Sequence, residues 1–247
     1  MNTDRVSSES SYLPSPSEKK KYVQHMFDKV ASRYDFLNHF LSLGIDFYWR
    51  HQALKLINFN MNPRLLDLAT GTGDIAVMAV KRGARKVIGI DLSFNMLRVG
   101  NKKIIKKDAA DSIAMVCGEG ENLPLPNESM DAATIAFGIR NVEDIQKTLN
   151  EMARVLTNSG VIVVLEFSKP TWPVIKQLYQ FYFLYVLPRI GSMISSDKEA
   201  YHYLPHSVLN FPERGDFVNV MKQSGFTDVR VFDMSFGIVT AYCGIKL

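Results

Sequence analysis

A glycine turn between two acidic residues is the part of the sequence best suited to chemistry. The apolar residues 64–68 run into Gly71 and Gly73, and Asp67 lies just before the glycines. Glycines at such a turn let the backbone bend tightly and approach a ligand without a Cβ atom in the way. Asp91 follows the next apolar segment, where a carboxylate can accept hydrogen bonds from both hydroxyls of a ribose. The pattern therefore predicts a site for a cofactor that contains a ribose.

The glycines alone leave two classes of cofactor open. Gly71, Gly73 and Ala76 also satisfy the dinucleotide pattern G-x-G-x-x-G/A, so that NAD and S-adenosylmethionine (SAM) both fit. Two features favour SAM. Asp67 precedes the glycines, as in SAM enzymes, where a carboxylate helps to organise the loop beneath the methionine moiety. The last two expected strands also form an antiparallel hairpin, which dinucleotide-binding domains ordinarily lack.

A third polar loop, residues 118–126, lies between two expected strands. Glu119 and Gly120 occupy the positions at which class I methyltransferases contact the adenine amino group, with backbone amides nearby. Each of these residues, taken singly, is equally typical of an ordinary surface loop. Three such elements in the order of one cofactor site favour SAM binding.

The segments that carry these residues alternate between strand and helix. Strands are expected over residues 64–68, 86–90, 113–116, 132–136, 160–167, 228–234 and 238–245, and helices over residues 74–82, 95–106, 142–156 and 212–224. This alternation predicts a parallel sheet, and the short connection between the last two strands predicts an antiparallel pair. We therefore expect an α/β fold with a doubly wound, seven-stranded, mostly parallel sheet and an antiparallel last strand.

The regions outside this alternation predict the rest of the chain's organisation. Residues 1–17 are polar and rich in Ser and Pro, which is typical of a disordered tail. Residues 18–33 and 46–59 carry apolar side chains at helical spacing, so we expect N-terminal helices before the sheet. An aromatic-rich insertion at about residues 171–210 is expected to form a helical lid. Residues 18–247 would then be a single domain, a size that one core can fill.

Composition and charge exclude several classes of protein. The formal net charge of +4 is too small for the usual footprint of a nucleic-acid-binding protein. Cys117 and Cys243 make neither a disulfide framework nor a zinc site, so we expect no metal and a reducing, cytoplasmic environment. The first residues lack the apolar core of a signal peptide. The longest apolar run, residues 181–188, is far shorter than the ~20 residues of a membrane span.

Several longer strings lie outside the cofactor motifs. They are Tyr-Asp-Phe-Leu-Asn at 34–38, Trp-Arg at 49–50, Phe-Gly-Ile-Arg-Asn at 137–141, Leu-Glu-Phe-Ser-Lys-Pro at 165–170, Leu-Pro-Arg-Ile-Gly at 187–191 and Tyr-His-Tyr-Leu at 201–204. In these strings the chain resembles the UbiE/MenG family of polyprenyl-quinone C-methyltransferases over essentially residues 20–247. Asp46 departs from the family, which usually has a histidine there, and the turn at residues 157–160 departs from its usual Lys-Pro-Gly-Gly.

The resemblance implies a SAM-dependent enzyme that methylates the ring of a polyprenyl quinol. The acceptor would be demethylmenaquinol or the methoxy-polyprenyl-benzoquinol of ubiquinone synthesis. By the same resemblance, the residues that contact SAM are Thr72, Asp91, Glu119 and Gly120.

Ring methylation sets the demands on the acceptor side. A ring carbon attacks a sulfonium methyl group well only when a neighbouring hydroxyl has lost its proton, so the protein must stabilise a phenolate and remove that proton. Arg140 is the candidate for phenolate stabilisation, because a guanidinium stays charged when buried. Asn141 would orient a hydroxyl or cap the following helix. Glu166 would act as a base through water or pair with Arg140. Any one of Tyr201, His202 and His206 could close over the ring, and a histidine would suit removal of the proton near neutral pH.

Other functions and partners stay open at this point. The alternatives are a methyltransferase for another apolar acceptor, such as a sterol or tocopherol precursor, a non-catalytic SAM-binding subunit, and a nicotinamide oxidoreductase. The aromatic residues between 172 and 194 would suit a polyprenyl tail or peripheral contact with the inner face of the cytoplasmic membrane. A homodimer or a quinone-synthesis complex is a further option.

Overall fold

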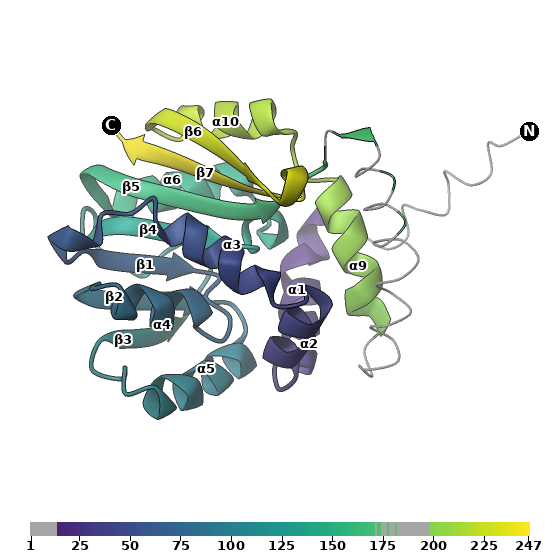
Figure 1. The fold of residues 1–247 in the computed structure, drawn as a ribbon, viewed down its shortest axis with the longest axis horizontal. Coiled ribbons are helices and arrows are strands. Elements are labelled where there is room, and N and C mark those ends of the chain that lie inside the picture. The colour runs from purple at the N-terminus through teal and green to yellow at the C-terminus, as the bar shows by residue number, and fades with distance from the viewer. Residues whose placement is uncertain (1–13, 171, 174–176, 178–180, 182–197) are drawn as a thin grey trace, which may run out of the picture.

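The alternation of strands and helices builds one seven-stranded sheet in the computed structural model, which describes residues 14–170, 172, 173, 177, 181 and 198–247 (Figure 1). The strands are β1 (Arg64–Leu68), β2 (Lys86–Asp91), β3 (Ile113–Cys117), β4 (Met130–Ala136), β5 (Leu156–Phe167), β6 (Phe226–Met234) and β7 (Val239–Lys246). Their order across the sheet is β3-β2-β1-β4-β5-β7-β6. β7 runs antiparallel to both neighbours, and the other neighbouring pairs are parallel. The predicted doubly wound sheet is confirmed.

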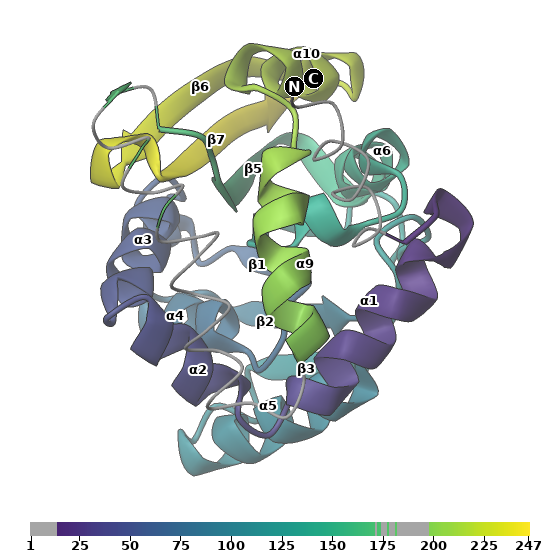
Figure 2. The ribbon, with the colours of Figure 1, turned by 90° about the vertical axis from the view of Figure 1, so that its right-hand side faces the viewer.

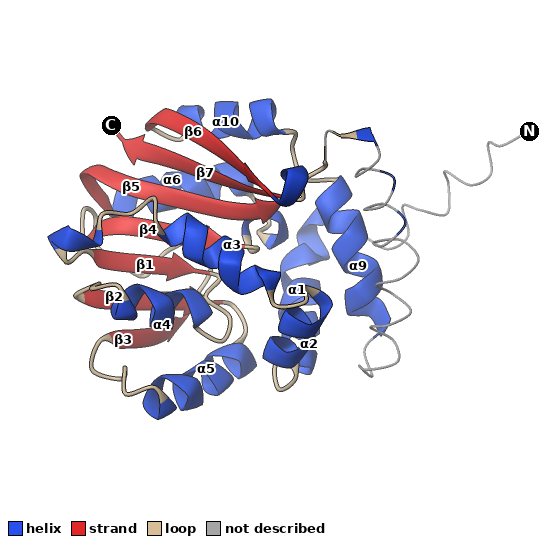
Figure 3. Ribbon diagram, viewed as in Figure 1, coloured by secondary structure: helices blue, strands red, loops and turns tan. Residues whose placement is uncertain are grey.

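Helices cover both faces of this sheet (Figure 3). One face carries α3 (Ile45–Leu54), α4 (Asp74–Lys81) and α5 (Phe94–Lys106), and the other carries α6 (Ile145–Val155) and α10 (Arg214–Gln223). β1 shows why both faces need cover: Leu65 packs into the core under α3 and α4, and Leu66 packs into the core under α6 and α10. Side chains of a strand alternate between the two faces. A strand that is apolar throughout is therefore buried on both.

Three helices gather at one end of the sheet, beyond the carboxyl ends of the parallel strands. They are α1 (Pro16–Val30), α2 (Tyr34–Leu41) and α9 (Lys198–Leu209) (Figure 2). α1 and α9 pack against each other through Val23, Met26 and Tyr203, and the rings of Tyr22 and Tyr203 have centroids 5.5 Å apart. Open α/β sheets bind their ligands at this end. These helices are therefore placed to enclose a site.

Several element boundaries differ from those expected. α1 begins at Pro16, inside the expected tail, and the chain forms a separate helix, α2, before α3. α6 begins at Ile145, because Asp144 caps it and accepts a hydrogen bond from the backbone N–H of Lys147. The suggestion that Asn141 caps this helix is therefore wrong, since Asn141 lies in a short 3-10 turn ahead of it.

The expected lid, residues 171–210, lies partly outside the described residues. Its described part consists of α9, the residue that follows it, and residues 172, 173, 177 and 181. Among the residues that the structure describes, no helix is both long enough and apolar enough to cross a lipid bilayer.

Candidate functional site

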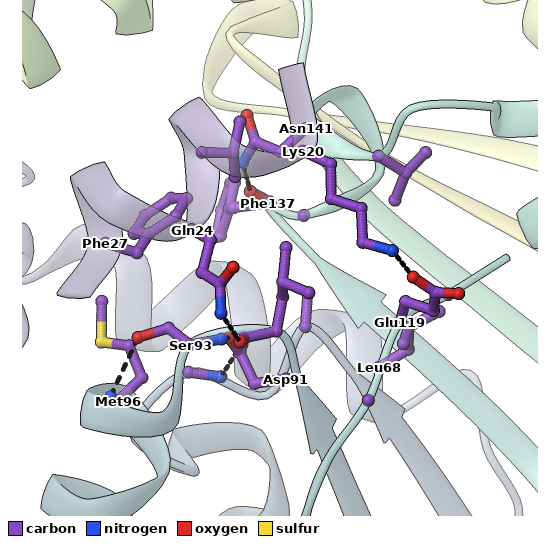
Figure 4. Close-up of a pocket in the computed structure, with 18 of the residues that line it drawn as sticks. Lys20, Gln24, Phe27, Leu68, Asp91, Ser93, Met96, Glu119, Phe137 and Asn141 are labelled. Carbon is purple, nitrogen blue, oxygen red and sulfur yellow. Dashed lines mark hydrogen bonds and ion pairs between the residues drawn. The ribbon is translucent and has the colours of Figure 1, made fainter. Parts of the chain in front are cut away.

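A cavity opens where the strand order changes direction, between the carboxyl ends of β1 and β4 and helix α1 (Figure 4). It contains about 790 Å³ of space free of protein atoms, counting the part open to solvent. The lining residues that matter most are Lys20, Gln24, Tyr34, Leu68, Gly71, Asp91, Glu119, Gly120, Phe137 and Asn141.

The glycine turn after β1 forms the floor of this cavity. Gly71 and Gly73 both have left-handed backbone conformations, with φ of +56° and +82°, which favour glycine. Asp67 lies beneath the turn and accepts hydrogen bonds from Thr70 Oγ1 at 2.6 Å and Thr134 Oγ1 at 2.8 Å. Burial raises the pKa of Asp67 to about 7, and the two hydroxyls oppose that rise. Asp67 and Gly73 therefore shape the turn from behind, while Gly71 reaches the cavity.

Asp91 lines the cavity at the end of β2. Its Oδ2 accepts a hydrogen bond from the N–H of Gly71 at 2.8 Å, and its Oδ1 accepts one from the N–H of Ser93 at 2.8 Å. Each carboxylate oxygen has a second lone pair that a ligand hydroxyl can use. Burial raises the pKa of Asp91 to about 6, and the backbone hydrogen bonds oppose the rise. Asp91 can thus accept hydrogen bonds from the glycine turn and from a bound ligand at the same time.

The loop after β3 brings Glu119 and Gly120 to the other side of the cavity. Glu119 forms an ion pair with Lys20 on α1 (Figure 4). A Cβ atom on Gly120 would lie 2.9 Å from Thr148 Cγ2, so the loop can pack this closely on α6 only with glycine there. Both residues line the cavity, and their contact with adenine stays a prediction.

Helix α1 covers the cavity, a role that sequence reasoning missed. Besides the Lys20 ion pair, Gln24 Nε2 donates a hydrogen bond to the carbonyl of Leu92 at 3.2 Å, and Lys19 Nζ donates one to the carbonyl of Val142 at 2.7 Å. The sequence marked α1 only as a helix ahead of the sheet. Its contacts join residues that are far apart in the chain, so the spacing of residues within α1 does not predict them.

Thr72 lies behind the glycine turn and not in the lining of the cavity. Its Oγ1 donates to Asp35 Oδ1 and accepts from Lys103 Nζ at 2.9 Å. Asp35, His39 and Asp74 lie close enough together to hold a metal ion. However, Lys103 Nζ lies 2.6 Å from Asp35 and 2.7 Å from Asp74. The lysine ammonium therefore already supplies the positive charge at this place.

Asp46, the residue that replaces the usual histidine, anchors a buried polar cluster. It accepts hydrogen bonds from His39 Nδ1 and Ser42 Oγ, each at 2.8 Å, and it pairs with Arg50. Only 2% of Asp46 is exposed. The aspartate thus fixes the orientation of Arg50, which lies one turn further along α3.

Gly138, at the start of the turn that contains Arg140, approaches the glycine turn closely. An added Cβ atom would lie 2.4 Å from Ala69 Cβ, so the backbone would have to move. Gly138→Ala should lower the free energy of unfolding by about 1–3 kcal/mol, the usual cost of overpacking. Urea denaturation measures this change. Gly215→Ala in α10 is the matched control, because no atom lies within 4 Å of its added Cβ, and alanine should stabilise that helix by about 0.5–1 kcal/mol. Equal stability of the Gly138→Ala variant and the parent would contradict the close approach.

Arg140 and Glu166 form a buried ion pair at the same edge of the sheet. Arg140 Nη1 lies 2.5 Å from Glu166 Oε1 and also donates to the carbonyl of Phe137 at 2.8 Å. Arg140 Nε donates to Ser207 Oγ of α9 at 3.2 Å. Burial raises the pKa of Glu166, and the charge of Arg140 opposes that rise. Of the two predicted roles of Glu166, the geometry fits pairing with Arg140.

Asn141 lines the cavity next to this pair. Its Oδ1 accepts a hydrogen bond from the Tyr203 hydroxyl at 3.2 Å. Burial raises the pKa of Tyr203 to about 12, so this hydroxyl remains a donor at neutral pH. Asn141 Nδ2 donates a long hydrogen bond to the carbonyl of Phe137 at 3.5 Å, and its second N–H can serve a ligand. Tyr201 belongs to the same helix, but its side chain lies outside the described residues.

A second buried arginine lies near the cavity, although neither Arg50 nor Arg140 is among its lining residues. The guanidinium of Arg50 lies 5.5 Å from the ring centroid of Phe137, and that of Arg140 lies 5.5 Å from the ring centroid of Phe167. Burial raises the pKa of Tyr34, which lines the cavity, and the charges of Arg50 and Arg140 oppose that rise without overcoming it. The sequence signal for Arg50 was its place in a string shared with the family, but no role followed from it.

Comparisons with known proteins agree with this geometry. The model of the ubiE/COQ5 methyltransferase family matches residues 16–246. The chain is 49% identical over 232 residues to a ubiquinone/menaquinone biosynthesis C-methyltransferase UbiE of Citrifermentans bemidjiense, covering 93% of this chain and 98% of the relative. It is 39% identical over 230 residues to a demethylmenaquinone methyltransferase of Bacteroides fragilis, covering 93% of this chain and 94% of the relative.

Solved structures support the fold. A SAM-dependent methyltransferase of Thermotoga maritima is similar with a TM-score of 0.65 at 21% identity, covering 91% of this chain and all of the other. The [4+2]-cyclase SpnF is similar with a TM-score of 0.67 at 14% identity, covering 91% of this chain and 94% of the other. A cyclase on the same fold shows that the fold alone does not fix the reaction. The family match over nearly the whole length does fix the class, and the chain belongs to the ubiE/COQ5 methyltransferase family.

Proposed function

We propose that this enzyme transfers a methyl group from SAM to a ring carbon of a polyprenyl quinol. Demethylmenaquinol is the first candidate acceptor, and the methoxy-polyprenyl-benzoquinol is the second. The observation that carries the proposal is the composition of one cavity, in which Asp91 and Glu119 share a space with Phe137 and Asn141. Donor and acceptor groups can therefore meet within it. The relatives, a ubiquinone/menaquinone biosynthesis C-methyltransferase and a demethylmenaquinone methyltransferase, support a quinone as the acceptor.

The residues at the β1 and β2 ends fit SAM, which supplies an electrophilic sulfonium methyl group. Asp91 would accept hydrogen bonds from the ribose hydroxyls, and Glu119 and Gly120 would contact the adenine. Gly71 allows close approach of the backbone, with φ of +56°. Asp67, Thr72 and Gly73 would act indirectly, by holding the turn in place.

The raised pKa of Asp91 gives SAM binding a dependence on pH. Since burial raises that pKa to about 6, the carboxylate becomes protonated as the pH falls through about 6 and loses both its charge and part of its accepting capacity. SAM affinity should then fall by up to about tenfold per pH unit below that value. Calorimetric titrations from pH 5 to pH 8, roughly one unit below the pKa to two above it, measure the dependence.

Asp91→Asn is the control for this dependence, because the amide does not titrate. Any change of affinity with pH that persists in Asp91→Asn reports another group. Asp67 is the nearest candidate, because burial raises its pKa to about 7. An identical pH profile in the parent and in Asp91→Asn would contradict the assignment of the titration to Asp91.

On the acceptor side, the two buried arginines would stabilise the phenolate that makes the ring carbon nucleophilic. Glu166 holds Arg140 through their ion pair, and Asp46 holds Arg50. Asn141 would orient a quinol hydroxyl. Tyr201 stays a candidate for contact with the ring.

An acceptor panel tests the proposal. The purified chain is incubated with SAM that carries a deuterated methyl group and with short-chain analogues of several acceptors. These are demethylmenaquinol, its oxidised quinone, a methoxy-benzoquinol, a tocopherol precursor and a sterol. The labelled methyl group should appear on the reduced quinols, because the oxidised ring has no hydroxyl to ionise. Preferred labelling of the sterol or the tocopherol precursor would contradict the acceptor class.

The place of action and the partners belong to the same proposal. A polyprenyl quinol resides in a bilayer, so we place the enzyme in the cytoplasm, at the inner face of the cytoplasmic membrane as a peripheral protein. A homodimer or a complex with other enzymes of quinone synthesis is compatible with that place.

A further inference from the structure

A patch of large apolar side chains faces outward on α2, the following turn and the start of α3. The patch consists of Phe36, Phe40, Leu43, Ile45, Phe47 and Tyr48, each with an exposed fraction between 43% and 84%. We name it the α2–α3 patch. A contiguous apolar surface on a soluble protein marks a place of contact with a partner, a ligand or a membrane.

The side chains of this patch form one surface across two helices. The rings of Phe36 and Phe40 stack with centroids 5.7 Å apart, and the rings of His39 and Phe47 stack at 4.2 Å. The inner sides of these helices are buried, as Leu37 shows at 4% exposure. The apolar residues of the patch are therefore additional to those that hold the helices on the protein.

Leu43 is the clearest sign that the exposure has a use. It is 84% exposed, and its φ of +52° lies in the left-handed region, where a bulky side chain is disfavoured. Asparagine or glycine would suit that backbone better, and neither would expose a large apolar side chain to water. Neither conformation nor solubility explains a leucine at this tip, whereas insertion into an apolar phase does.

Basic side chains lead to the patch along α1. Lys21, His25 and Lys29 are exposed at spacings of four residues, and Arg33, also exposed, follows immediately before α2. Residues four apart lie on one face of a helix, so the ammonium groups of Lys21 and Lys29, two such steps apart, share one face of α1. Positive charge gathered on one face suits attraction to an anionic surface.

The acidic residues of the same segment are fewer than its basic residues. Residues 19–50 carry three aspartates, Asp28, Asp35 and Asp46, against six lysines and arginines. Two of these six, Lys20 and the buried Arg50, pair with Glu119 and Asp46 and do not belong to the stripe. Asp28 accepts a hydrogen bond from Ser93 Oγ at 2.6 Å, Asp35 pairs with Lys103, and Asp46 is buried. An apolar patch beside a net positive helix is complementary to anionic lipid, whereas a second copy of the chain would bring the same positive charge to the contact.

The patch also lies at the end of the molecule that contains the cavity. α1 and α2 both lie beyond the carboxyl ends of the strands (Figure 2). Tyr34, the first residue of α2, lines the cavity, and Phe36 of the patch follows two residues later. Contact of the patch with a bilayer would thus bring the cavity close to the lipid phase.

We propose that the α2–α3 patch docks on the surface of an anionic lipid bilayer, with Leu43 and the phenylalanines inserted among the lipids and the basic stripe of α1 near the headgroups. The proposal rests on the proposed function, since it explains how an enzyme with no membrane span among its described residues would collect a polyprenyl quinol from a membrane.

Vesicle co-sedimentation of the full chain tests the docking. The vesicles contain phosphatidylglycerol and phosphatidylcholine in equal parts, or phosphatidylcholine alone. The parent chain should bind the anionic vesicles and bind phosphatidylcholine at least about tenfold more weakly. Leu43→Asp, a single change at an exposed tip, and the triple variant Phe36→Ser, Phe40→Ser, Leu43→Ser should each reduce binding to the anionic vesicles about tenfold or more.

Matched controls separate docking from general loss of apolar surface. Met61→Ser and Ile105→Ser remove side chains that are 77% and 69% exposed outside the patch, and both should bind like the parent. Failure of the parent to bind anionic vesicles, or unchanged binding by both patch variants, would overturn the proposal. The proposal would also be overturned if the parent is a dimer in size-exclusion chromatography and Leu43→Asp is a monomer, because the patch would then be a subunit interface.

The assay does not use catalysis, so its outcome is separate from that of the proposed function. Normal turnover of a short-chain quinol by Leu43→Asp, together with lost vesicle binding, supports docking and function at once. If Leu43→Asp loses vesicle binding and the parent chain methylates no quinol, the docking surface is supported and the proposed function is contradicted.

Discussion

Arg140→Met should reduce methyl transfer by about two to three orders of magnitude, the usual cost of removing one group that stabilises developing negative charge. Arg140 precedes Asn141, which lines the cavity, and its positive charge opposes the rise that burial causes in the pKa of the Tyr34 hydroxyl. SAM should bind with nearly unchanged affinity, because Arg140 is not among the residues that line the cavity. Single-turnover kinetics and SAM titration measure the two effects separately.

The partner of Arg140 supplies the control for this experiment. Arg140→Met leaves the carboxylate of Glu166 fully buried without its counter-charge, which should cost about 3–5 kcal/mol of stability. The double variant Arg140→Met, Glu166→Gln removes both charges and should regain much of that stability. Turnover should stay low in both variants. Recovery of turnover together with stability would show that Arg140 only holds the fold.

Asp91→Ala should weaken SAM binding by about ten- to a hundredfold. Hydrogen bonds to a charged group contribute about 1.5–3 kcal/mol, and each 1.4 kcal/mol corresponds to about a factor of ten in affinity. The change also removes the acceptor for the N–H of Gly71, so the glycine turn loses one of its supports. Isothermal titration with SAM measures the loss.

Asp91→Asn is the conservative counterpart of this variant. The amide oxygen can still accept the hydrogen bond from the N–H of Gly71, whereas the amide nitrogen cannot accept the one from the N–H of Ser93. The glycine turn should thus keep this support while the charge is lost. We expect an affinity between those of the parent and Asp91→Ala. Turnover at saturating SAM should remain close to that of the parent, because Asp91 does not face the acceptor. Unchanged SAM affinity in Asp91→Ala would contradict the proposed contact between Asp91 and the ribose.

The parts of the structure that the sequence predicted are those that depend on local pattern. Apolar runs such as residues 86–90, each followed by a helical segment, could become buried strands only in a sheet covered on both faces. The positions of Asp67 and Asp91 follow directly, since each residue is tied to the end of a strand. Glu119 and Gly120 were found because their loop follows the third strand.

The parts that the sequence did not predict depend on contacts between distant segments. Nothing near Lys20 indicates that it pairs with Glu119, and nothing near Arg50 indicates that its charge acts on Tyr34 together with that of Arg140. The boundary of α6 was misplaced for a different reason, because Asn141 and Asp144 are both good capping residues. The ion pair of Arg140 and Glu166 was foreseen only as an alternative, since pattern alone does not say which charges meet.

The most direct test of the proposed reaction is the quinone profile of membranes from cells that lack their own quinone C-methyltransferase and express this chain. Mass spectrometry of the extracted quinones should show methylated menaquinone, or methylated ubiquinone precursors, in cells with the parent chain. Cells with Arg140→Met should retain the demethylated forms. If only demethylated quinones persist with a parent chain that is folded and binds SAM, quinol methylation is contradicted, and the acceptor belongs to another class.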